Sequence, residues 1–257
     1  MSRARTGISE LDKMLGGGFM AGDSVLLVGA AGTGKTTLGL QYLVNGVTQF
    51  GENGIYVTFE QLPDQIYRDA KNFGWDLRKM EEENKFRLVC TSPDVLLEAH
   101  DGEHLLDEPI REVKARRIVI DSLSHLQMYS KEGDLRKEAY RLIMYLKTRG
   151  LSSLLTWESH EIVSPTSTVT AVGVSFLVDC LLILRFVEIE SSMRRSLVIL
   201  KMRGSDHDMR LREFKITSQG IKVAQPFSGY EGVITGTPRK LLAENAARTR
   251  AKRRSKP

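Results

Sequence analysis

The stretch Gly29-Ala30-Ala31-Gly32-Thr33-Gly34-Lys35-Thr36 decides how this chain folds. It matches the pattern G-x-x-x-x-G-K-[ST] of a phosphate-binding loop. An apolar run at residues 24–28 precedes it, and a helix-like segment at residues 38–43 follows it. Glycines let backbone N–H groups turn toward a phosphate, and the following helix directs the positive end of its dipole at the same oxygens. The stretch therefore predicts a nucleotide-binding turn between a buried strand and a helix.

Two side chains of this loop have distinct predicted roles. Lys35 is expected to reach the β- and γ-phosphate oxygens, and the Thr36 hydroxyl is expected to bind Mg²⁺. A glycine-rich turn between a strand and a helix can also be purely structural, but all four fixed positions are present and favour binding. The residues predicted to contact ATP here are Gly29, Ala30, Ala31, Gly32, Thr33, Gly34, Lys35, Thr36 and Thr37.

Length and composition set the outer frame. A chain of 257 residues, 41% of them hydrophobic, is enough for one large domain. We place this domain at residues 1–238. No apolar run is long enough to span a bilayer, and Met1–Arg5 leads into no secretory segment, so we expect a soluble, cytoplasmic protein. Cys90 and Cys180 lack metal-ligand spacing and are expected to be thiols in the core.

The positive charge is concentrated at the C-terminus. Residues 239–257 hold eight Lys or Arg and one Glu, which leaves 29 basic and 31 acidic residues in the rest of the chain. We expect this basic tail to be mobile, because it has few large apolar side chains. It could bind nucleic acid, anionic lipid or an acidic partner through counterion release, or it could only aid solubility.

Strand-like apolar runs alternate with helix-like segments, which predicts an α/β fold with a mostly parallel, twisted sheet flanked by helices. The helix at residues 135–149 should end at Gly150, and a first helix, residues 10–15, should be capped by Ser9. Residues 182–190 and 195–202 read as an antiparallel hairpin that extends the sheet. The runs that predict the preceding strands are 25–28, 54–59, 86–90, 117–120 and 151–157.

Carboxylates follow three of these predicted strands. Asp121 ends a buried run and is the candidate for the Mg²⁺ shell. Glu60 lies just past the strand at 54–59 and is the candidate general base that orients water, although it could instead cap the following helix. Glu158 is a weaker candidate, as a sensor of the γ-phosphate.

Several segments together carry a family resemblance. The chain resembles the KaiC branch of the RecA-like ATPases, as a single domain, from Thr6 to about Pro238. Its fold should therefore be that of a RecA-like P-loop NTPase. The segments that carry the resemblance are Thr6-Gly7-Ile8, Leu15-Gly16-Gly17-Gly18, the phosphate loop, Phe59-Glu60, Val119-Ile120-Asp121-Ser122, Leu200-Lys201-Met202-Arg203-Gly204-Ser205-Asp206-His207-Asp208 and Arg212-Glu213-Phe214.

The resemblance implies a ring, usually a hexamer, with Mg·ATP bound between subunits. Lys35 and Thr36 would lie on one side of the nucleotide, and Lys201 and Arg203 would reach in from the neighbouring subunit. His207 would border the ribose or base, or else lie in an ordinary surface loop. The function implied is that of an ATP-hydrolysing regulatory switch that engages or releases a protein partner.

Two positions depart from the family pattern. Where the family's clock proteins have two adjacent glutamates, this chain has Glu60-Gln61, so hydrolysis could be slow or altered. Where their kinase domain has adjacent phosphorylated Ser and Thr, this chain has Ser175-Phe176. Autophosphorylation, at Ser175 or in the Ser/Thr-rich segment 164–170, is therefore a hypothesis.

Two other functions stay open at this point. A recombinase-type protein would use the same core to control nucleic-acid affinity with ATP, and the basic tail favours this alternative. The near-neutral body and the loop 161–173, which has no Lys or Arg, oppose it. A scaffold that binds ATP without hydrolysing it is compatible with Gln61.

Overall fold

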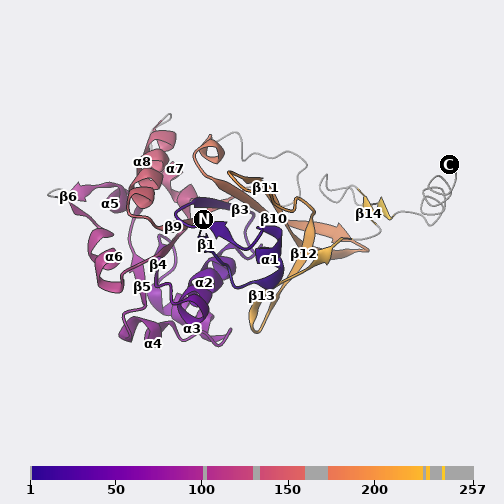
Figure 1. Ribbon diagram of the computed structural model, residues 1–257, viewed down its shortest axis with the longest axis horizontal. Coiled ribbons are helices and arrows are strands. Elements are labelled where there is room, and N and C mark those ends of the chain that lie inside the picture. The colour runs from indigo at the N-terminus through magenta and orange to yellow at the C-terminus, as the bar shows by residue number, and fades with distance from the viewer. Residues whose placement is uncertain are drawn as a thin grey trace.

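The computed structural model describes residues 2–100, 103–129, 134–159, 173–227, 230–231 and 239–240. Its centre is a nine-stranded sheet in the order β13-β12-β11-β10-β3-β9-β8-β4-β5. The six strands from β10 to β5 run parallel, and β11, β12 and β13 continue the sheet antiparallel on one side (Figure 1). The strands are β3 (Ser24–Gly29), β4 (Gly54–Thr58), β5 (Phe86–Cys90), β8 (Arg117–Asp121), β9 (Ser152–Glu158), β10 (Cys180–Ile189), β11 (Ser192–Met202), β12 (Arg212–Thr217) and β13 (Gly220–Pro226).

Three two-stranded ribbons accompany the main sheet. Each consists of strands of two residues that pair antiparallel. The ribbons are β1 (Arg3–Ala4) with β2 (Phe19–Met20), β6 (Ala99–His100) with β7 (Glu103–His104), and β14 (Tyr230–Glu231) with β15 (Arg239–Lys240).

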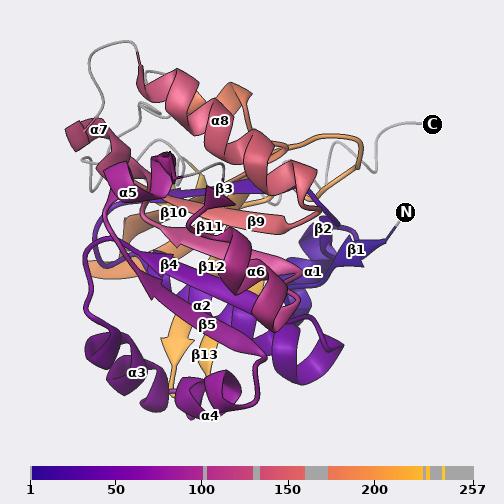
Figure 2. The same cartoon turned by 90° about the vertical axis from the view of Figure 1, so that its left-hand side faces the viewer.

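Helices cover both faces of the sheet and give it two apolar cores. One core packs α1 to α4 against the sheet, and the other packs α5 to α8 against the opposite face. Figure 2 shows this arrangement, with α8 above the sheet and α2, α3 and α4 below it. The helices are α1 (Ser9–Met14), α2 (Lys35–Asn45), α3 (Pro63–Lys71), α4 (Leu77–Glu82), α5 (Pro93–Leu97), α6 (Asp107–Val113), α7 (Leu126–Tyr129) and α8 (Leu135–Thr148).

The predicted architecture is confirmed. All five predicted parallel strands exist, as β3, β4, β5, β8 and β9, and the predicted hairpin is β10–β11. The helix α8 buries one stripe, Ala139, Leu142, Ile143 and Leu146, and ends before Gly150 as predicted. The φ of Gly150, 69°, is the left-handed conformation that glycine adopts without strain. The sequence did not reveal β12 and β13, which add two strands beyond the hairpin.

Two local predictions were wrong. Ser9 is the first residue of α1 and not its cap, because Asp12 folds back from inside the helix and accepts hydrogen bonds from the backbone of Thr6 and Gly7. Cys180 is buried, but Cys90 is exposed. Cys90 ends β5, an edge strand of the sheet, which has a neighbouring strand, β4, on one side alone among the described residues.

Some predictions concern residues outside the described ranges. Of the basic tail, the structure describes Arg239 and Lys240 alone, and the segment 164–170 with its alternative phosphate acceptors is not described. Within the described ranges, none of the helices combines the length and apolar character that a bilayer crossing requires.

Candidate active site

The phosphate loop joins β3 to α2, as the sequence predicts. Gly34 directly precedes α2 with a φ of 107°, a conformation that disfavours other residues. A Cβ on Gly29 would come within 2.6 Å of Thr33 Oγ1 and 2.9 Å of the Leu184 carbonyl oxygen, so β10 leaves no room for a side chain. Thr33 is fully buried and donates to the Ala30 carbonyl at 2.7 Å, which closes the turn from within.

The remaining loop residues lie toward the surface. Ala31 and Gly32 are exposed, and Thr36 and Thr37 are half-buried in the first turn of α2. Helix α2 therefore begins at an accessible loop with its amino end toward solvent, the geometry that favours an anion.

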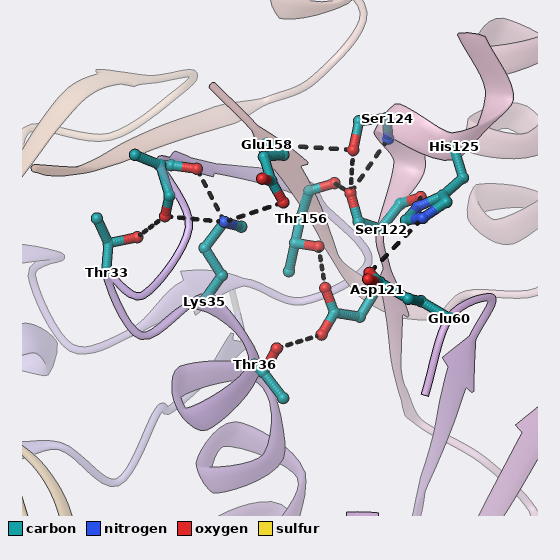
Figure 3. Close-up of polar contacts among 12 residues, drawn as sticks. Thr33, Lys35, Thr36, Glu60, Asp121, Ser122, Ser124, His125, Thr156 and Glu158 are labelled. Atoms are coloured by element: carbon teal, nitrogen blue, oxygen red, sulfur yellow. Dashed lines mark hydrogen bonds and ion pairs between the residues drawn. The ribbon is translucent and has the colours of Figure 1, made fainter. Parts of the chain in front are cut away.

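Lys35 is held at the base of the loop. Its Nζ donates to the carbonyl oxygens of Gly29 at 2.9 Å and Ala30 at 3.0 Å, and lies 3.9 Å from the Glu158 carboxylate. Burial lowers the pKa of the Lys35 ammonium from its ordinary value, while the carboxylates of Glu158, Asp121 and Glu60 act in the opposite direction. The weaker candidate Glu158 is thus the acid nearest to the loop lysine (Figure 3).

Asp121 ends β8 opposite the first turn of α2. Its Oδ2 accepts hydrogen bonds from Thr36 Oγ1 and from the Tyr56 hydroxyl, both at 2.6 Å, and its Oδ1 accepts one from Thr156 Oγ1. Burial raises the pKa of Tyr56 well above its ordinary value, and Asp121 adds to that shift, so the phenol stays protonated and donates. The carboxylate is therefore fixed in place beside Thr36 (Figure 3).

The pair formed by Asp121 and Thr36 fits a Mg²⁺ ion that is bound together with a nucleotide. The described residues include no group of three or more His, Cys, Asp or Glu arranged to hold a metal. Mg²⁺ commonly uses one or two carboxylates, water and substrate phosphates in place of an all-protein cage. The Asp121 carboxylate and the Thr36 hydroxyl, 2.6 Å apart at the mouth of the loop, match that requirement.

Glu60 lies on the segment after β4, and its side chain is 73% exposed. Its Oε2 lies 3.7 Å from His125 Nε2, and among the described residues this is the ion-pair contact of Glu60 (Figure 3). The Gln61 backbone N–H donates to Thr58 Oγ1 at 3.2 Å, which turns the chain at the strand end. Glu60 thus projects from the same sheet edge as Asp121 and the phosphate loop.

The predicted residues Lys201, Arg203 and His207 do not join this group within one chain. In the sheet, Cys180 pairs with Val25 on one side and with Met202 on the other, so Lys201 and Arg203 lie near the start of β3. The phosphate loop instead follows the end of β3, where Gly29 pairs with Leu184. The start and the end of β3 are four residues apart, which is about 13 Å along the strand. His207 lies in the segment after β11, where the Asp208 N–H donates to the Met14 carbonyl of α1.

Local contacts hold both cations at this opposite edge. Lys201 Nζ donates to the carbonyl oxygens of Ser175 at 2.9 Å and Val178 at 2.7 Å. Arg203 donates to the Phe176 carbonyl at 2.8 Å and lies 3.7 Å from the Asp179 carboxylate. Its side chain is 55% exposed, so its guanidinium is accessible from outside the chain.

Sequence reasoning missed four residues of this region. Tyr56 and Thr156 lie inside strands and read as core residues, and His125 had no motif around it. Arg195, on β11, donates to the Gly32 carbonyl at 3.2 Å and its guanidinium lies 5.4 Å from the centre of the Phe186 ring. The hairpin prediction contained Arg195, but only the pairing of β10 with β3 places it at the loop.

Comparison with known proteins agrees with this geometry. Residues 4–228 match the family model "ATPase: KaiC". The chain belongs to the KaiC ATPase family. The resemblance in the sequence is thereby confirmed, and the chain carries a KaiC-type ATPase domain with a RecA-like P-loop fold.

Three relatives illustrate the extent of the match. The chain is 35% identical to the circadian clock protein KaiC3 of Synechocystis sp. (strain ATCC 27184 / PCC 6803 / Kazusa) over 237 residues, 92% of this chain and 46% of the relative. It is 36% identical to the circadian clock oscillator protein KaiC of Synechococcus elongatus over 232 residues, 87% and 44%. For KaiC of Prochlorococcus marinus the identity is 32% over 245 residues, 95% and 47%. The chain thus spans less than half the length of these relatives.

Proposed function

We propose that this KaiC family member is a Mg²⁺-dependent ATP hydrolase whose active site is completed between two copies of the chain. The observation that carries the proposal is the separation of the site into two halves. Lys35, Thr36 and Asp121 lie at the carboxyl ends of the parallel strands. Lys201 and Arg203 lie at the level of the amino ends of these strands, out of reach of their own loop. Neighbours placed head to tail would bring the two halves together, and such contacts close into rings. We propose a hexamer by analogy with the family.

In this mechanism each residue has one task. The loop backbone and Lys35 bind the β- and γ-phosphates, and Thr36 and Asp121 hold Mg²⁺, which would neutralise phosphate charge when bound. Glu60 takes a proton from the water that attacks the γ-phosphorus. Lys201 and Arg203 of a second copy stabilise the charge that develops on the transferred phosphoryl group, and His207 of that copy borders the ribose or base.

The output proposed for this chemistry is a regulatory switch. Hydrolysis would change the contacts at each interface between two copies, here called a seam, and thereby the ring's affinity for a protein partner. The names of the relatives attach a circadian role to those proteins, and the partner of this chain is left to experiment. We also propose a cytoplasmic location, in keeping with the unpaired thiols Cys90 and Cys180.

Two alternatives receive less support. The autokinase hypothesis needs an accessible acceptor, whereas Ser175 is only 7% exposed and its carbonyl accepts from Lys201. Incubation with γ-labelled ATP that leaves the protein unlabelled would remove that hypothesis. If the protein were recombinase-like, added DNA should increase the rate of ATP hydrolysis. This increase should persist after truncation at Pro238, which removes the basic tail.

The proposal is tested on three variants of the full chain. Lys35→Ala should abolish nucleotide binding, and Glu60→Gln should lower kcat by roughly a hundredfold while ATP still binds. Arg203→Ala should lower kcat but preserve assembly, because its proposed task is to stabilise charge on the transferred phosphoryl group and not to join the copies. Phosphate release and native mass, each with and without Mg·ATP, measure chemistry and assembly together. Full turnover by both Lys35→Ala and Glu60→Gln would contradict the assignment of roles.

A further inference from the structure

His125 is a second titratable side chain beside the proposed base. It ends a short 3-10 turn, Leu123–His125, that follows β8, and its ring is tilted against Phe59 with the ring centres 6.0 Å apart. Its Nε2 lies 3.7 Å from Glu60 Oε2, and the imidazole is 24% exposed (Figure 3). Water can therefore reach both members of the pair.

The contacts of His125 determine which nitrogen carries the proton. Nδ1 lies 3.2 Å from the carbonyl oxygen of Ser122, and a carbonyl oxygen can only accept a hydrogen bond. Nδ1 must therefore be the donor, which leaves a lone pair on Nε2 of the neutral ring. That lone pair faces the Glu60 carboxylate. A proton placed on Glu60 consequently has an acceptor next to it.

The other charged groups around this edge are already engaged. Asp121, at the end of β8, accepts from three hydroxyl groups, and Glu158, at the end of β9, lies 3.9 Å from Lys35 Nζ of α2. Among the described residues, Glu60 is the acid within ion-pair distance of His125. The neighbour of Glu60 in sequence is Gln61, whose amide does not accept a proton at neutral pH.

We propose that His125 relays the proton that Glu60 takes from the attacking water, an inference that rests on the proposed role of Glu60. The water oxygen bonds to the γ-phosphorus while the bond to the β,γ-bridging oxygen breaks and ADP leaves. One water proton moves to the Glu60 carboxylate, then to His125 Nε2, and then to solvent. His125 acts through Glu60 and is thus a positioning residue.

The relay assigns His125 to the chemical step and not to nucleotide binding. Only a side chain with a lone pair at the place of Nε2 can take the proton from Glu60. Removing the imidazole should therefore lower kcat for ATP and leave KM unchanged.

The decisive variant is His125→Asn in the full-length chain. The asparagine amide can still donate to the Ser122 carbonyl, but it has no acceptor at the place of Nε2. We expect kcat to fall roughly tenfold, with KM for ATP, native mass and melting temperature unchanged. Gln127→Ala, an exposed change two residues away, should leave both kcat and KM as in the parent.

Two further variants separate the possible failures. In a Glu60→Gln background, His125→Asn should have no additional effect, because the two residues act in series. If His125→Asn retained full kcat while Glu60→Gln was inactive, the relay would be wrong and the base would stand. If Glu60→Gln itself kept full turnover, the proposed base would be wrong and the relay would fail with it. Should His125→Asn fold poorly, His125→Gln gives the same test, since its amide also cannot relay a proton.

Discussion

At the scale of single residues, Asp23, just before β3, has a pKa that is shifted by its surroundings. Burial raises the pKa of Asp23 to about 6, and the negative charge of Asp179 adds to the shift, against the opposing effects of Lys147, Arg203 and Arg3. Asp179 lies 2.6 Å from Lys147 and 3.7 Å from Arg203, so this cluster also holds a cation assigned to the neighbouring site.

A raised acid pKa gives a stability prediction with a definite sign. The ordinary value is 3.8, so between about pH 4 and pH 6 the folded chain binds more protons at Asp23 than the unfolded chain. Its contribution to stability is present below this window and is lost as the pH rises through it. Asp23→Asn should therefore raise the free energy of unfolding at pH 7.5 by about 1 kcal/mol, after allowance for solvent screening, and change it little at pH 4. Urea unfolding at both pH values measures this, and equal effects at the two would contradict it.

At the scale of elements, Arg117 at the start of β8 fastens both α2 and the segment that follows it. Arg117, the first residue of β8, is fully buried, donates through Nε to Glu52 at 2.6 Å and through Nη1 to the Tyr42 carbonyl at 2.8 Å. Its guanidinium lies 4.5 Å from the centre of the Tyr42 ring. The helix behind the phosphate loop is thus fixed at its far end.

Glu52→Gln should be costly because Arg117 cannot reach water. The change leaves a buried cation without its counter-charge, and we expect the free energy of unfolding to fall by about 2–4 kcal/mol. Glu83→Gln is the matched control, since Glu83 and Lys85 form an exposed pair at 2.7 Å. The midpoint of urea unfolding should shift clearly for Glu52→Gln and hardly for the control. Equal midpoints for the two variants would show that the pair of Arg117 and Glu52 does not stabilise the fold.

The β10–β11 hairpin brings Arg195 to the phosphate loop, and this gives a binding prediction. Arg195→Ala should raise the Kd for ATP roughly tenfold or more, because a cation beside the loop carbonyl of Gly32 is lost. Arg194, which pairs with Glu213 at 3.3 Å, provides the control variant Arg194→Ala. Calorimetric titration with a non-hydrolysable ATP analogue measures both. The same Kd for both variants would place Arg195 outside the site.

The same scale explains what the sequence could predict. The phosphate loop and the strand that ends at Asp121 could be predicted from local patterns, because a glycine turn and a buried strand are each determined by residues close together in the sequence. Arg195 contacts Gly32 across 163 positions of sequence, so only the strand order places it. Cys90 was misplaced for the same reason, since an apolar run does not reveal that its strand is at the edge. His125 reaches Glu60 only because β8 and β4 are neighbours.

At the scale of the whole molecule, the two halves of the candidate site lie at opposite ends of the parallel strands. Lys35 and Asp121 lie at one end, and Arg203 lies at the other. In the proposed mechanism Lys201 and Arg203 lie too far from their own loop to act there, whereas a closed ring would supply them at every seam. Assembly and catalysis are coupled in this account.

The measurement that tests this coupling most directly is ATP hydrolysis by mixed assemblies. Lys35→Ala and Arg203→Ala should each be nearly inactive alone. After equal mixing and reassembly, about a quarter of the seams would join an intact loop from one copy to intact cations from another, and turnover should recover to about that fraction of the parent. Co-assembly is verified by native mass. Mixed rings as inactive as either variant alone, or full activity of diluted single chains, would contradict the account.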